Sequence, residues 1–397
     1  MALNTIIAGG GIGGLTVALC LNHFGHRVTV LEQAEHLSDV GAGIQISPNA
    51  MKVFDKLGLT SAILAKGFEP DALEMRLGRS GGNIFKVPLT AETLNRWGAP
   101  YVHIHRADLV DILSAALEQG APGSIQLSQK VTGYDQTETD ITARLVHGKS
   151  LTGDILIGSD GIHSAVRAQM LGPDQATFTG CVAWRATVTM DKLGELAPPP
   201  TACVWVGPGR HAVTYQLRGG QLANLVAVVE RSNWTSESWT QHGTCEAALE
   251  DFAGWHPIIR NMIKTADQHF QWALYDRAPL PKWTDGRAAL VGDACHPMLP
   301  FAAQGAVMAI EDAWVLADQL SRAEGHPAAA LQTYFKTRIK RTSKVQADAR
   351  KNMKIFHKPA GIGQLATYSP MWIAGRFVPA IIRANRDKLY AHDVTAA

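Results

Sequence analysis

The stretch GDACHPMLPFAAQG (292–305) combines residue types that could do chemistry, because Asp293 is followed closely by Cys295 and His296. A cysteine beside a histidine could bind a metal ion or act as an activated thiol. Either function needs a third ligand or an orienting acid, and the neighbouring sequence offers none. We therefore predict no metal site and no thiol nucleophile here. The preceding segment ALVG is typical of a buried strand, and open α/β sheets bind ligands where such strands end.

His211 and Tyr215 stand four residues apart in GRHAVTYQLRGG (209–220), a segment typical of a strand. Residues i and i+4 of a strand lie on the same face, so the imidazole and the phenol would project together. A histidine whose pKa lies near the working pH is suited to take a proton from a phenol, directly or through Tyr215. The alternative is that both residues are ordinary packed residues of a sheet.

Gly9, Gly11 and Gly14 form a G-x-G-x-x-G pattern between the strand NTIIA and an apolar helical segment. In this context the glycines allow a tight turn, and the start of the helix faces the phosphates of a dinucleotide. Glu32 ends the next strand, where a carboxylate can accept hydrogen bonds from ribose hydroxyls. A carboxylate there disfavours a 2′-phosphate, so the pattern predicts FAD or NAD. A glycine turn without a ligand is the alternative.

The composition excludes several classes of partner. The chain has 397 residues, 46% of them hydrophobic, and a formal net charge of +2. This balance predicts binding neither to nucleic acid nor to an anionic membrane. No run of about 18 apolar residues predicts a membrane span, and the N-terminus does not resemble a signal peptide. Five scattered cysteines are typical of a reduced, cytoplasmic protein, and the sequence leaves a homodimer open.

The order of elements predicts an α/β fold. A strand, a glycine turn, a helix and a second strand fill residues 4–33, which is typical of a parallel sheet covered by helices. A helix is predicted over 106–119. From about residue 176 short β-branched and aromatic segments predict a mostly antiparallel sheet that forms one wall of a pocket. The strand and helix pattern returns from 286, and the C-terminal part is mostly helical.

Three further segments accompany the N-terminal glycines: GAGIQISPNAM (41–51), DILIGSDGIHSAVR (154–167) and LVGD (290–293). Together, and in this order, the four motifs resemble those of the group A FAD-dependent aromatic hydroxylases, the family of p-hydroxybenzoate hydroxylase. The resemblance runs from residue 3 to about 320. It implies a Rossmann-like FAD-binding domain of the GR2 type that is interrupted by a β-sheet substrate domain. The implied FAD-binding parts are 1–75, 101–175 and 276–350, the substrate domain is 76–100 and 176–275, and 351–397 is a C-terminal helical segment.

The resemblance also implies which residues contact the cofactor. The implied FAD contacts are Gly9, Gly11, Gly14, Glu32, Gly43, Arg106, Val131, Asp160, Asp293, Pro300, Gly305 and Ala306. Asp160 and Arg167 belong to a motif that the family also uses for NADH or NADPH, although Arg167 could be an exposed helix cation. The helix after residue 304 would turn its positive end towards the flavin ring. The family's usual asparagine after the glycine is absent, which leaves only backbone and apolar groups at 305–308.

The segment 209–220 looks like that of 3-hydroxybenzoate 6-hydroxylases and salicylate hydroxylase-like proteins. The resemblance implies that NADH or NADPH reduces FAD, that O2 forms a flavin C4a-hydroperoxide, and that a small phenolic aromatic acid is hydroxylated. Arg185 and Arg218 are candidates for its carboxylate, with structural ion pairs as the alternative. Gln45 and Phe301 are candidates for the pocket wall. A ring hydroxylase of quinone biosynthesis and a non-oxygenating NAD-binding dehydrogenase or sensor are the alternative functions.

Overall fold

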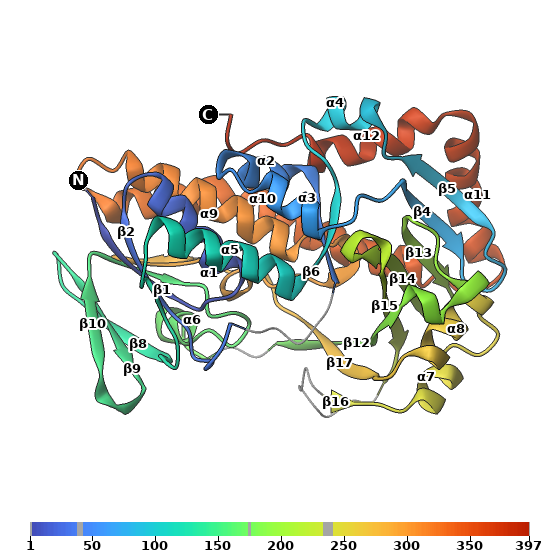
Figure 1. Cartoon of the computed structure of the whole chain (residues 1–397), viewed down its shortest axis with the longest axis horizontal. Coiled ribbons are helices and arrows are strands. Elements are labelled where there is room, and N and C mark those ends of the chain that lie inside the picture. The colour runs from blue at the N-terminus through green and yellow to red at the C-terminus, as the bar shows by residue number, and fades with distance from the viewer. Residues whose placement is uncertain (1, 38–42, 174–175, 233–240, 397) are drawn as a thin grey trace.

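Two sheets and a long helix dominate the protein, as the computed structural model shows (Figure 1). The structure describes residues 2–37, 43–173, 176–232 and 241–396. Residues 41 and 42, which begin the second motif, lie outside the described residues.

The first sheet is parallel apart from one edge pair. Its strands are β1 (Asn4–Ala8), β2 (Arg27–Leu31), β7 (Ile125–Gln126), β11 (Ile155–Gly158), β18 (Thr284–Asp285) and β19 (Ala288–Leu290). They lie in the order β18-β19-β11-β1-β2-β7, and only β18 and β19 are antiparallel. Ile7 and Ile157 are partners in register and are fully buried. Strands buried on both faces are typical of a sheet covered by helices on one side and further structure on the other.

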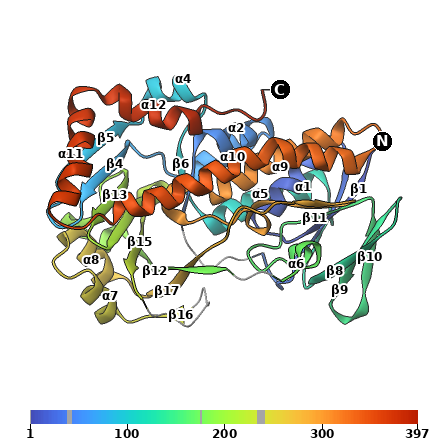
Figure 2. The ribbon, with the colours of Figure 1, turned by 180° about the vertical axis from the view of Figure 1, so that it is seen from behind.

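Helices α1 (Ile12–His23), α5 (Arg106–Gly120) and α9 (Gly305–Ser321) pack together on one side of this sheet, as Figures 1 and 2 show. The small antiparallel sheet lies on the other side and contains β8 (Val131–Gln136), β9 (Ile141–Leu145) and β10 (Ser150–Gly153). Helix α1 is apolar around most of its circumference because it is enclosed between the sheet and its neighbouring helices. The structure thus confirms the predicted α/β fold with a helix over 106–119.

The second sheet has eight strands and forms a curved wall at the other end of the molecule. Its strands are β4 (Ala72–Leu77), β5 (Asn83–Pro88), β12 (Thr177–Thr189), β13 (Ala202–Gly207), β14 (Arg210–Leu217), β15 (Leu222–Glu230), β16 (Gln241–His242) and β17 (Phe270–Asp276). They lie in the order β16-β17-β12-β15-β14-β13-β4-β5, and only β13 and β4 pair in parallel. Apolar side chains fill both of its faces in two separate clusters.

The remaining elements connect and cover the sheets. They are β3 (Gly43–Ile46), which pairs with β6 (Val102–His105), and the helices α2 (Pro48–Lys56), α3 (Thr60–Lys66), α4 (Ala91–Trp97), α6 (Ala165–Leu171), α7 (Cys245–Asp251), α8 (Pro257–Thr265), α10 (Pro327–Phe356), α11 (Ile362–Phe377) and α12 (Pro379–Tyr390). Helix α10 is about 45 Å long and extends from the first sheet to the second, in front of both in the view of Figure 2. Within the described residues, no helix combines the length and the apolar character that crossing a membrane requires.

Candidate active site

The turn between β1 and α1 needs its glycines for different reasons. Gly9 has a φ of 104°, and a Cβ on it would lie 2.4 Å from the carbonyl oxygen of Ser159. A Cβ on Gly14 would lie 1.9 Å from the carbonyl oxygen of Gly9, so Gly14 lets the helix pack against the strand. A Cβ on Gly11 would meet no described atom within 4 Å. Packing of the described residues therefore does not require a glycine at 11, which fits a position kept open for a bound group.

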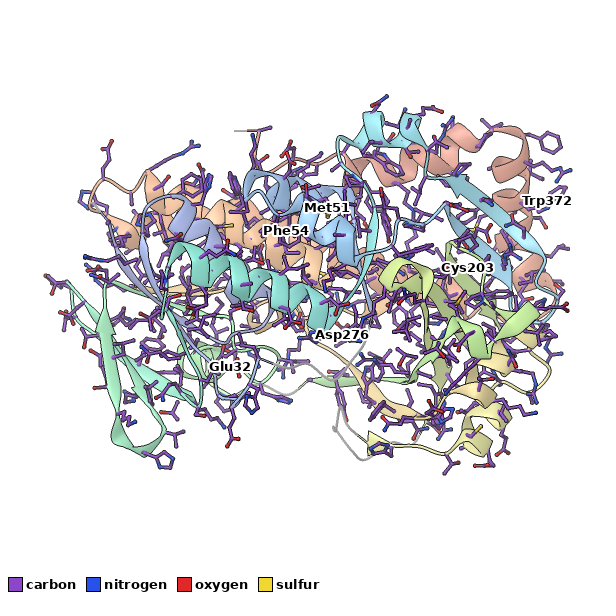
Figure 3. All side chains as sticks on the ribbon, viewed as in Figure 1. Glu32, Met51, Phe54, Cys203, Asp276 and Trp372 are labelled. Carbon is purple, nitrogen blue, oxygen red and sulfur yellow. The ribbon has the colours of Figure 1, made fainter. Side chains whose placement is uncertain are left out.

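A cavity of about 320 Å³, the nucleotide cavity, opens beside this turn. Glu32 lines it directly after β2 (Figure 3), and its carboxylate accepts the backbone N–H groups of Gly10 at 2.6 Å and Ala34 at 2.8 Å. Each carboxylate oxygen has a second lone pair, which leaves an acceptor for a ligand hydroxyl. The other predicted residues that line this cavity are Gly9, Gly11, Arg106, Val131 and Asp160.

Asp160 and Arg167 hold the segment that follows β11. One oxygen of Asp160 accepts the backbone N–H of Ala165 at 2.8 Å, while Oδ1 is buried and has no hydrogen-bond partner among the described residues. Burial raises the pKa of this carboxyl group above its usual value. Arg167 is buried and donates to the carbonyl oxygens of Ile162 at 2.6 Å and Ala294 at 3.1 Å. The alternative that Arg167 is an exposed helix cation is therefore wrong.

A second cavity of about 320 Å³, the ring cavity, adjoins the first, because Arg106 lines both. The eight-stranded sheet, β3 and the segment before α9 contribute its walls. The predicted residues that line it are Gly43, Arg106, His211, Tyr215, Asp293, Pro300, Gly305 and Ala306, together with Gln45 and Phe301. Of the implied FAD contacts and the two catalytic candidates, all but Gly14 thus line one of two adjoining cavities, and Gly14 supports the turn beside them.

The segment after β19 forms the side of the ring cavity nearest the nucleotide cavity. Desolvation by the surrounding protein raises the pKa of Asp293, while the charges of His296 and Arg106 act in the opposite direction. Gly305 and Ala306 begin α9 and line the cavity, so the free N–H groups and the positive end of the helix face it. This end of α9 can stabilise negative charge on a bound group.

His211 lies in the opposite wall, on β14. Its Nδ1 is 2.7 Å from Nε2 of His357, and the rings of Phe301 and Phe356 flank it at centroid distances of 5.1 and 5.2 Å. Burial, reinforced by nearby His357, holds the pKa of His211 well below its ordinary value. The imidazole is therefore neutral at pH 7, with one N–H donor and one lone pair that can accept a proton.

Tyr215 lies four residues further along β14 and also reaches the ring cavity. Its hydroxyl donates a hydrogen bond of 2.6 Å to the carbonyl oxygen of Gly43. Burial raises the pKa of this phenol above its ordinary value. A Cβ on Gly43 would lie 2.5 Å from the Tyr215 ring, so the close approach of β3 to β14 requires glycine at this position. The hydroxyl proton is thus engaged with the backbone, and Tyr215 fixes β3 against the sheet.

The two arginines predicted to bind a carboxylate lie in different places. Arg218 lines neither cavity, and its guanidinium donates to both oxygens of Asp108 at 2.8 and 2.9 Å. β14 ends at Leu217 and Arg218 has a φ of 50°, which turns its side chain away from the sheet face. Arg218 therefore has the structural ion pair that stood as its alternative, and it does not bind a carboxylate in the ring cavity. Arg185 lines the ring cavity, with its guanidinium 4.9 Å from the ring centroid of Trp272.

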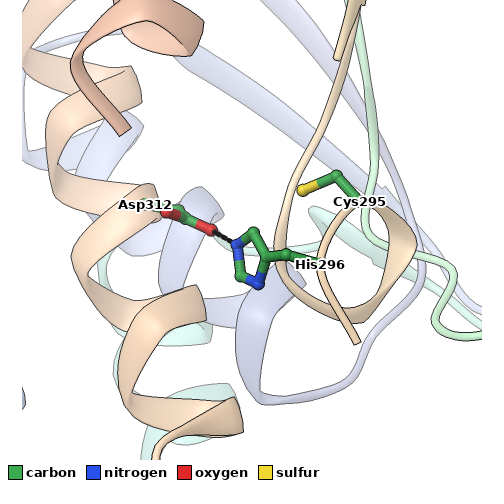
Figure 4. Close-up of side chains that lie close together, drawn as sticks. All are labelled: Cys295, His296 and Asp312. Carbon is green, nitrogen blue, oxygen red and sulfur yellow. Dashed lines mark hydrogen bonds and ion pairs between the residues drawn. The ribbon is translucent and has the colours of Figure 1, made fainter. Parts of the chain in front are cut away.

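The prediction that no acid accompanies Cys295 and His296 is also wrong (Figure 4). Helix α9 brings Asp312 back to the preceding segment, where its carboxylate pairs with Nε2 of His296. The same carboxylate accepts a hydrogen bond of 2.7 Å from Arg338. Although burial alone would raise the pKa of Asp312, His296 and Arg338 lower it. The carboxylate is therefore already paired with cationic and N–H groups, which indicates a structural role beside the ring cavity.

Sequence patterns missed several residues of the ring cavity. Arg386 and Tyr390 reach it from α12, and Tyr101 lines it while donating to Gln45 at 2.7 Å. Gln304 lines it just before α9, and its Oε1 is buried without a hydrogen-bond partner among the described residues. Local spacing gives no signal for these residues, because separate segments bring them together. Gln304 thus places a polar side chain directly before 305–308, where the sequence has only backbone and apolar groups.

Comparisons with known proteins agree with this geometry: the chain belongs to the FAD binding domain family, which it matches over residues 2–349. The 3-amino-4-hydroxybenzoate 2-monooxygenase of Streptomyces platensis is 38% identical over 355 residues, which cover 89% of each chain. The 3-hydroxybenzoate 6-hydroxylase of Aquipseudomonas alcaligenes is 36% identical over 359 residues, which cover 90% of this chain and 91% of the relative. Among solved structures, HpxO of Klebsiella pneumoniae with FAD and uric acid has a TM-score of 0.86 at 28% identity and covers 98% of this chain and 97% of its own.

These findings confirm the predicted group A flavin hydroxylase family and its cofactor. The protein is an FAD-dependent aromatic monooxygenase, which uses NAD(P)H as its reductant. The residues present fit FAD. The open space at Gly11 and the start of α1 suit a pyrophosphate, Glu32 offers acceptors to ribose hydroxyls, and the unpartnered Oε1 of Gln304 offers an acceptor to a ring N–H.

We predict that Asp293→Ala weakens FAD retention by roughly 10- to 100-fold, because a hydrogen bond to a charged group contributes about 1.5–3 kcal/mol. The prediction is motivated by the position of Asp293, which lines the ring cavity together with Arg106, the residue that lines both cavities. The measurement is the dissociation constant of FAD by flavin fluorescence. Asp318→Ala on the far part of α9, where the acid pairs with Arg322, is the matched control. Equal FAD affinities for both variants would remove Asp293 from the cofactor site.

Proposed function

We propose that this enzyme hydroxylates a small phenolic aromatic acid of the salicylate or 3-hydroxybenzoate type, using NADH or NADPH and O2. The observation that carries the proposal is the ring cavity, which a neutral histidine, Arg185 and Arg386 line together with the segment that begins α9. Its volume of about 320 Å³ is at the lower end of the range for small-ligand pockets, roughly 300–1,000 Å³. The names of the two relatives above, both enzymes of hydroxybenzoates, support this substrate class.

Arg386 and Arg185 can bind the carboxylate of an acid substrate. Arg386 lines the cavity from α12 and makes no ion pair within the part of the chain that the structure describes. Arg185 lines the same cavity from β12. A guanidinium matches the geometry of a carboxylate with two parallel hydrogen bonds, which gives orientation as well as affinity. The apolar side chains of Met75, Val226 and Phe301 leave a matching surface for the ring itself.

Reduced FAD supplies the two electrons that activate O2, so that one oxygen atom enters the aromatic ring and the other leaves as water. The chain's own residues bind the acid, exclude water from the ring and hold the phenol beside His211. Transfer of the phenol proton to the lone pair of His211 makes the ring a better nucleophile. His211 would thus act as a general base. The overall reaction consumes NADH, a proton, O2 and the phenol, and it yields NAD+, water and the hydroxylated phenol.

A screen of hydroxybenzoates and hydroxypyridine carboxylic acids tests the proposal. Each acid is added to the FAD-loaded enzyme with NADH, and both NADH oxidation and the aromatic product are measured. We expect one class of acid to stimulate NADH oxidation and to yield a hydroxylated product. If only neutral or prenylated phenols gave product, the acid class would be wrong and the quinone-pathway alternative would be favoured. Peroxide formation without any aromatic product would contradict the hydroxylase function.

We further propose that the enzyme assembles as a homodimer through α11. Trp372 points outward from this helix at the edge of the molecule (Figure 3), and the segment 362–381 contains a single charged residue, Arg376. Apolar, aromatic and arginine residues are typical of subunit interfaces. The exposed large apolar residues of this segment are Ile362, Leu365, Trp372, Ile373, Phe377, Val378 and Ile381. We expect sedimentation at twice 42.8 kDa for the natural protein and at the monomer mass for Trp372→Glu. A monomeric natural protein would contradict this assembly.

A further inference from the structure

A chain of three side chains leads from the ring cavity to the protein surface. Nδ1 of His211 lies 2.7 Å from Nε2 of His357, and Nδ1 of His357 lies 2.9 Å from Oε1 of Glu230. His211 comes from β14, Glu230 ends β15, and His357 directly follows α10. The neighbouring strands β14 and β15 and the distant end of α10 thus bring two imidazoles and a carboxylate into direct contact.

The exposure of these side chains increases from His211 through His357 to Glu230. His211 is 2% exposed and lines the ring cavity, whereas the side chain of His357 is 3% exposed and that of Glu230 is 54% exposed. The His211 end of this series therefore lies in the ring cavity, and the Glu230 end lies in solvent. The described residues show no hydrogen bond at Nε2 of His211, so this nitrogen remains available to a group in the cavity.

The carboxylate at the surface fixes the arrangement of protons. Because a carboxylate only accepts hydrogen bonds, Nδ1 of His357 carries the proton that it donates to Glu230. Nε2 of a neutral His357 then has the lone pair and accepts from Nδ1–H of His211. This places the remaining lone pair on Nε2 of His211, towards the cavity, where a base is needed.

We propose that His211, His357 and Glu230 form a relay that carries the proton of the substrate phenol to solvent and returns it to the product. This inference rests on the proposed phenol hydroxylation. The phenol O–H bond breaks as an Nε2–H bond forms on His211. The Nδ1 proton of His211 passes to Nε2 of His357, and the Nδ1 proton of His357 passes to Glu230. Protonation of the product phenolate by the reverse transfers restores the starting arrangement.

The groups around the relay determine whether its two imidazoles carry a charge. Burial lowers the pKa of His357, and Arg210 acts in the same direction, while Glu230 acts to raise it. His211 contacts His357 and the apolar rings of Phe301 and Phe356. Both imidazoles are therefore neutral at rest and hold a proton only during transfer, so the excess charge does not remain in the apolar wall.

Glu230→Gln tests the relay, because glutamine keeps the shape of the side chain but cannot be protonated. The probes are 3-hydroxybenzoate and its ring-fluorinated derivatives, which are progressively more acidic phenols. With 3-hydroxybenzoate at pH 7, we expect Glu230→Gln and His357→Gln to lower product formation per enzyme by roughly 10- to 100-fold. We expect this loss to shrink as the phenol becomes more acidic, because an ionised substrate no longer needs the relay. Glu250→Gln, an exposed acid on α7, is the control and should match the natural enzyme.

A loss of the same factor for every phenol would show that Glu230 and His357 act only on structure, and this result would overturn the relay. Unchanged product formation in both variants would overturn it as well. FAD binding and far-ultraviolet circular dichroism establish that each variant is folded, and the exposure of Glu230 makes its substitution the safer of the two. If the natural enzyme itself hydroxylated none of these phenols, the proposed substrate class would fail instead, which distinguishes the two failures.

Discussion

Replacing His211 with alanine is expected to lower the rate of hydroxylation by about 10²- to 10⁴-fold, the range that a positioned general base contributes. His211 lines the ring cavity, and burial holds its pKa well below its ordinary value and not near the working pH as expected from the sequence. The imidazole is therefore neutral at pH 7 and has a lone pair for the substrate proton, although burial makes it a weaker base than an exposed histidine. Without it the phenol stays protonated and the ring is a weaker nucleophile. NADH oxidation should continue, with its electrons released as hydrogen peroxide. The measurement is the ratio of aromatic product to NADH consumed.

Tyr215→Phe provides the comparison for this variant. The Tyr215 hydroxyl donates to Gly43, and its pKa is raised by burial, so the phenol holds β3 in place and does not carry the substrate proton. Loss of one neutral hydrogen bond costs about 0.5–1.5 kcal/mol, which corresponds to roughly a 2- to 13-fold effect. FAD content should stay unchanged in both variants. A larger loss in Tyr215→Phe than in His211→Ala would reverse the two roles.

Replacing Arg338 with leucine is expected to lower the free energy of unfolding by about 3–5 kcal/mol, the cost of leaving buried charges without their partner. Arg338 is 1% exposed. Its guanidinium donates to Glu311 and to Asp312, each at 2.7 Å. Arg341 would remain as a partner of Glu311, but Asp312 would keep only His296 and the backbone N–H of Gly292. The measurement is urea-induced unfolding with saturating FAD, because a bound ligand adds to the apparent stability.

Arg322→Leu is the matched control for this experiment. Arg322 pairs with Asp318 at 2.7 Å on the same helix, but its side chain is 58% exposed. An exposed pair of this kind contributes about 0.3–0.5 kcal/mol, so the control should unfold close to the natural protein. If both substitutions had the same small effect, Arg338 would not hold the buried acids in the way described.

The same cluster predicts how stability changes with pH. Although burial alone would raise the pKa of Glu311, Arg338 and Arg341 lower it from 4.5 to about 2. A depressed folded-state pKa means that the stabilising contribution is present above the unfolded value and is lost as the pH falls through the folded value. Glu311 should therefore contribute to acid unfolding between pH 4.5 and about 2.

Local patterns predicted the elements whose residues lie close together in the sequence. The glycine turn, Glu32 and the shared face of His211 and Tyr215 each depend on the geometry of one turn or one strand, which spacing reports directly. The α/β fold followed from the strand and helix periods for the same reason. The structure places these residues along adjoining cavities, while their individual roles in binding and catalysis stay predictions.

Contacts between distant segments had no such signal. His357 lies 146 residues after His211, and Asp312 reaches His296 only because α9 folds back along the loop. Arg386 belongs to α12, outside the part of the chain that matches the family. The choice between the two roles of Arg218 also depended on a distant segment, because its ion-pair partner Asp108 lies 110 residues earlier. Packing between elements, which no local window contains, decides such positions.

We expect one oxygen atom of O2 to enter the ring of a phenolic acid bound between His211 and the start of α9. Turnover of 3-hydroxybenzoate under ¹⁸O2, followed by mass spectrometry of the aromatic product, tests it most directly. We expect a dihydroxybenzoate that carries one ¹⁸O atom, in an amount that matches the NADH consumed. An aromatic product whose new oxygen comes from water, or NADH consumption that yields only labelled peroxide with every phenolic acid tried, would contradict it.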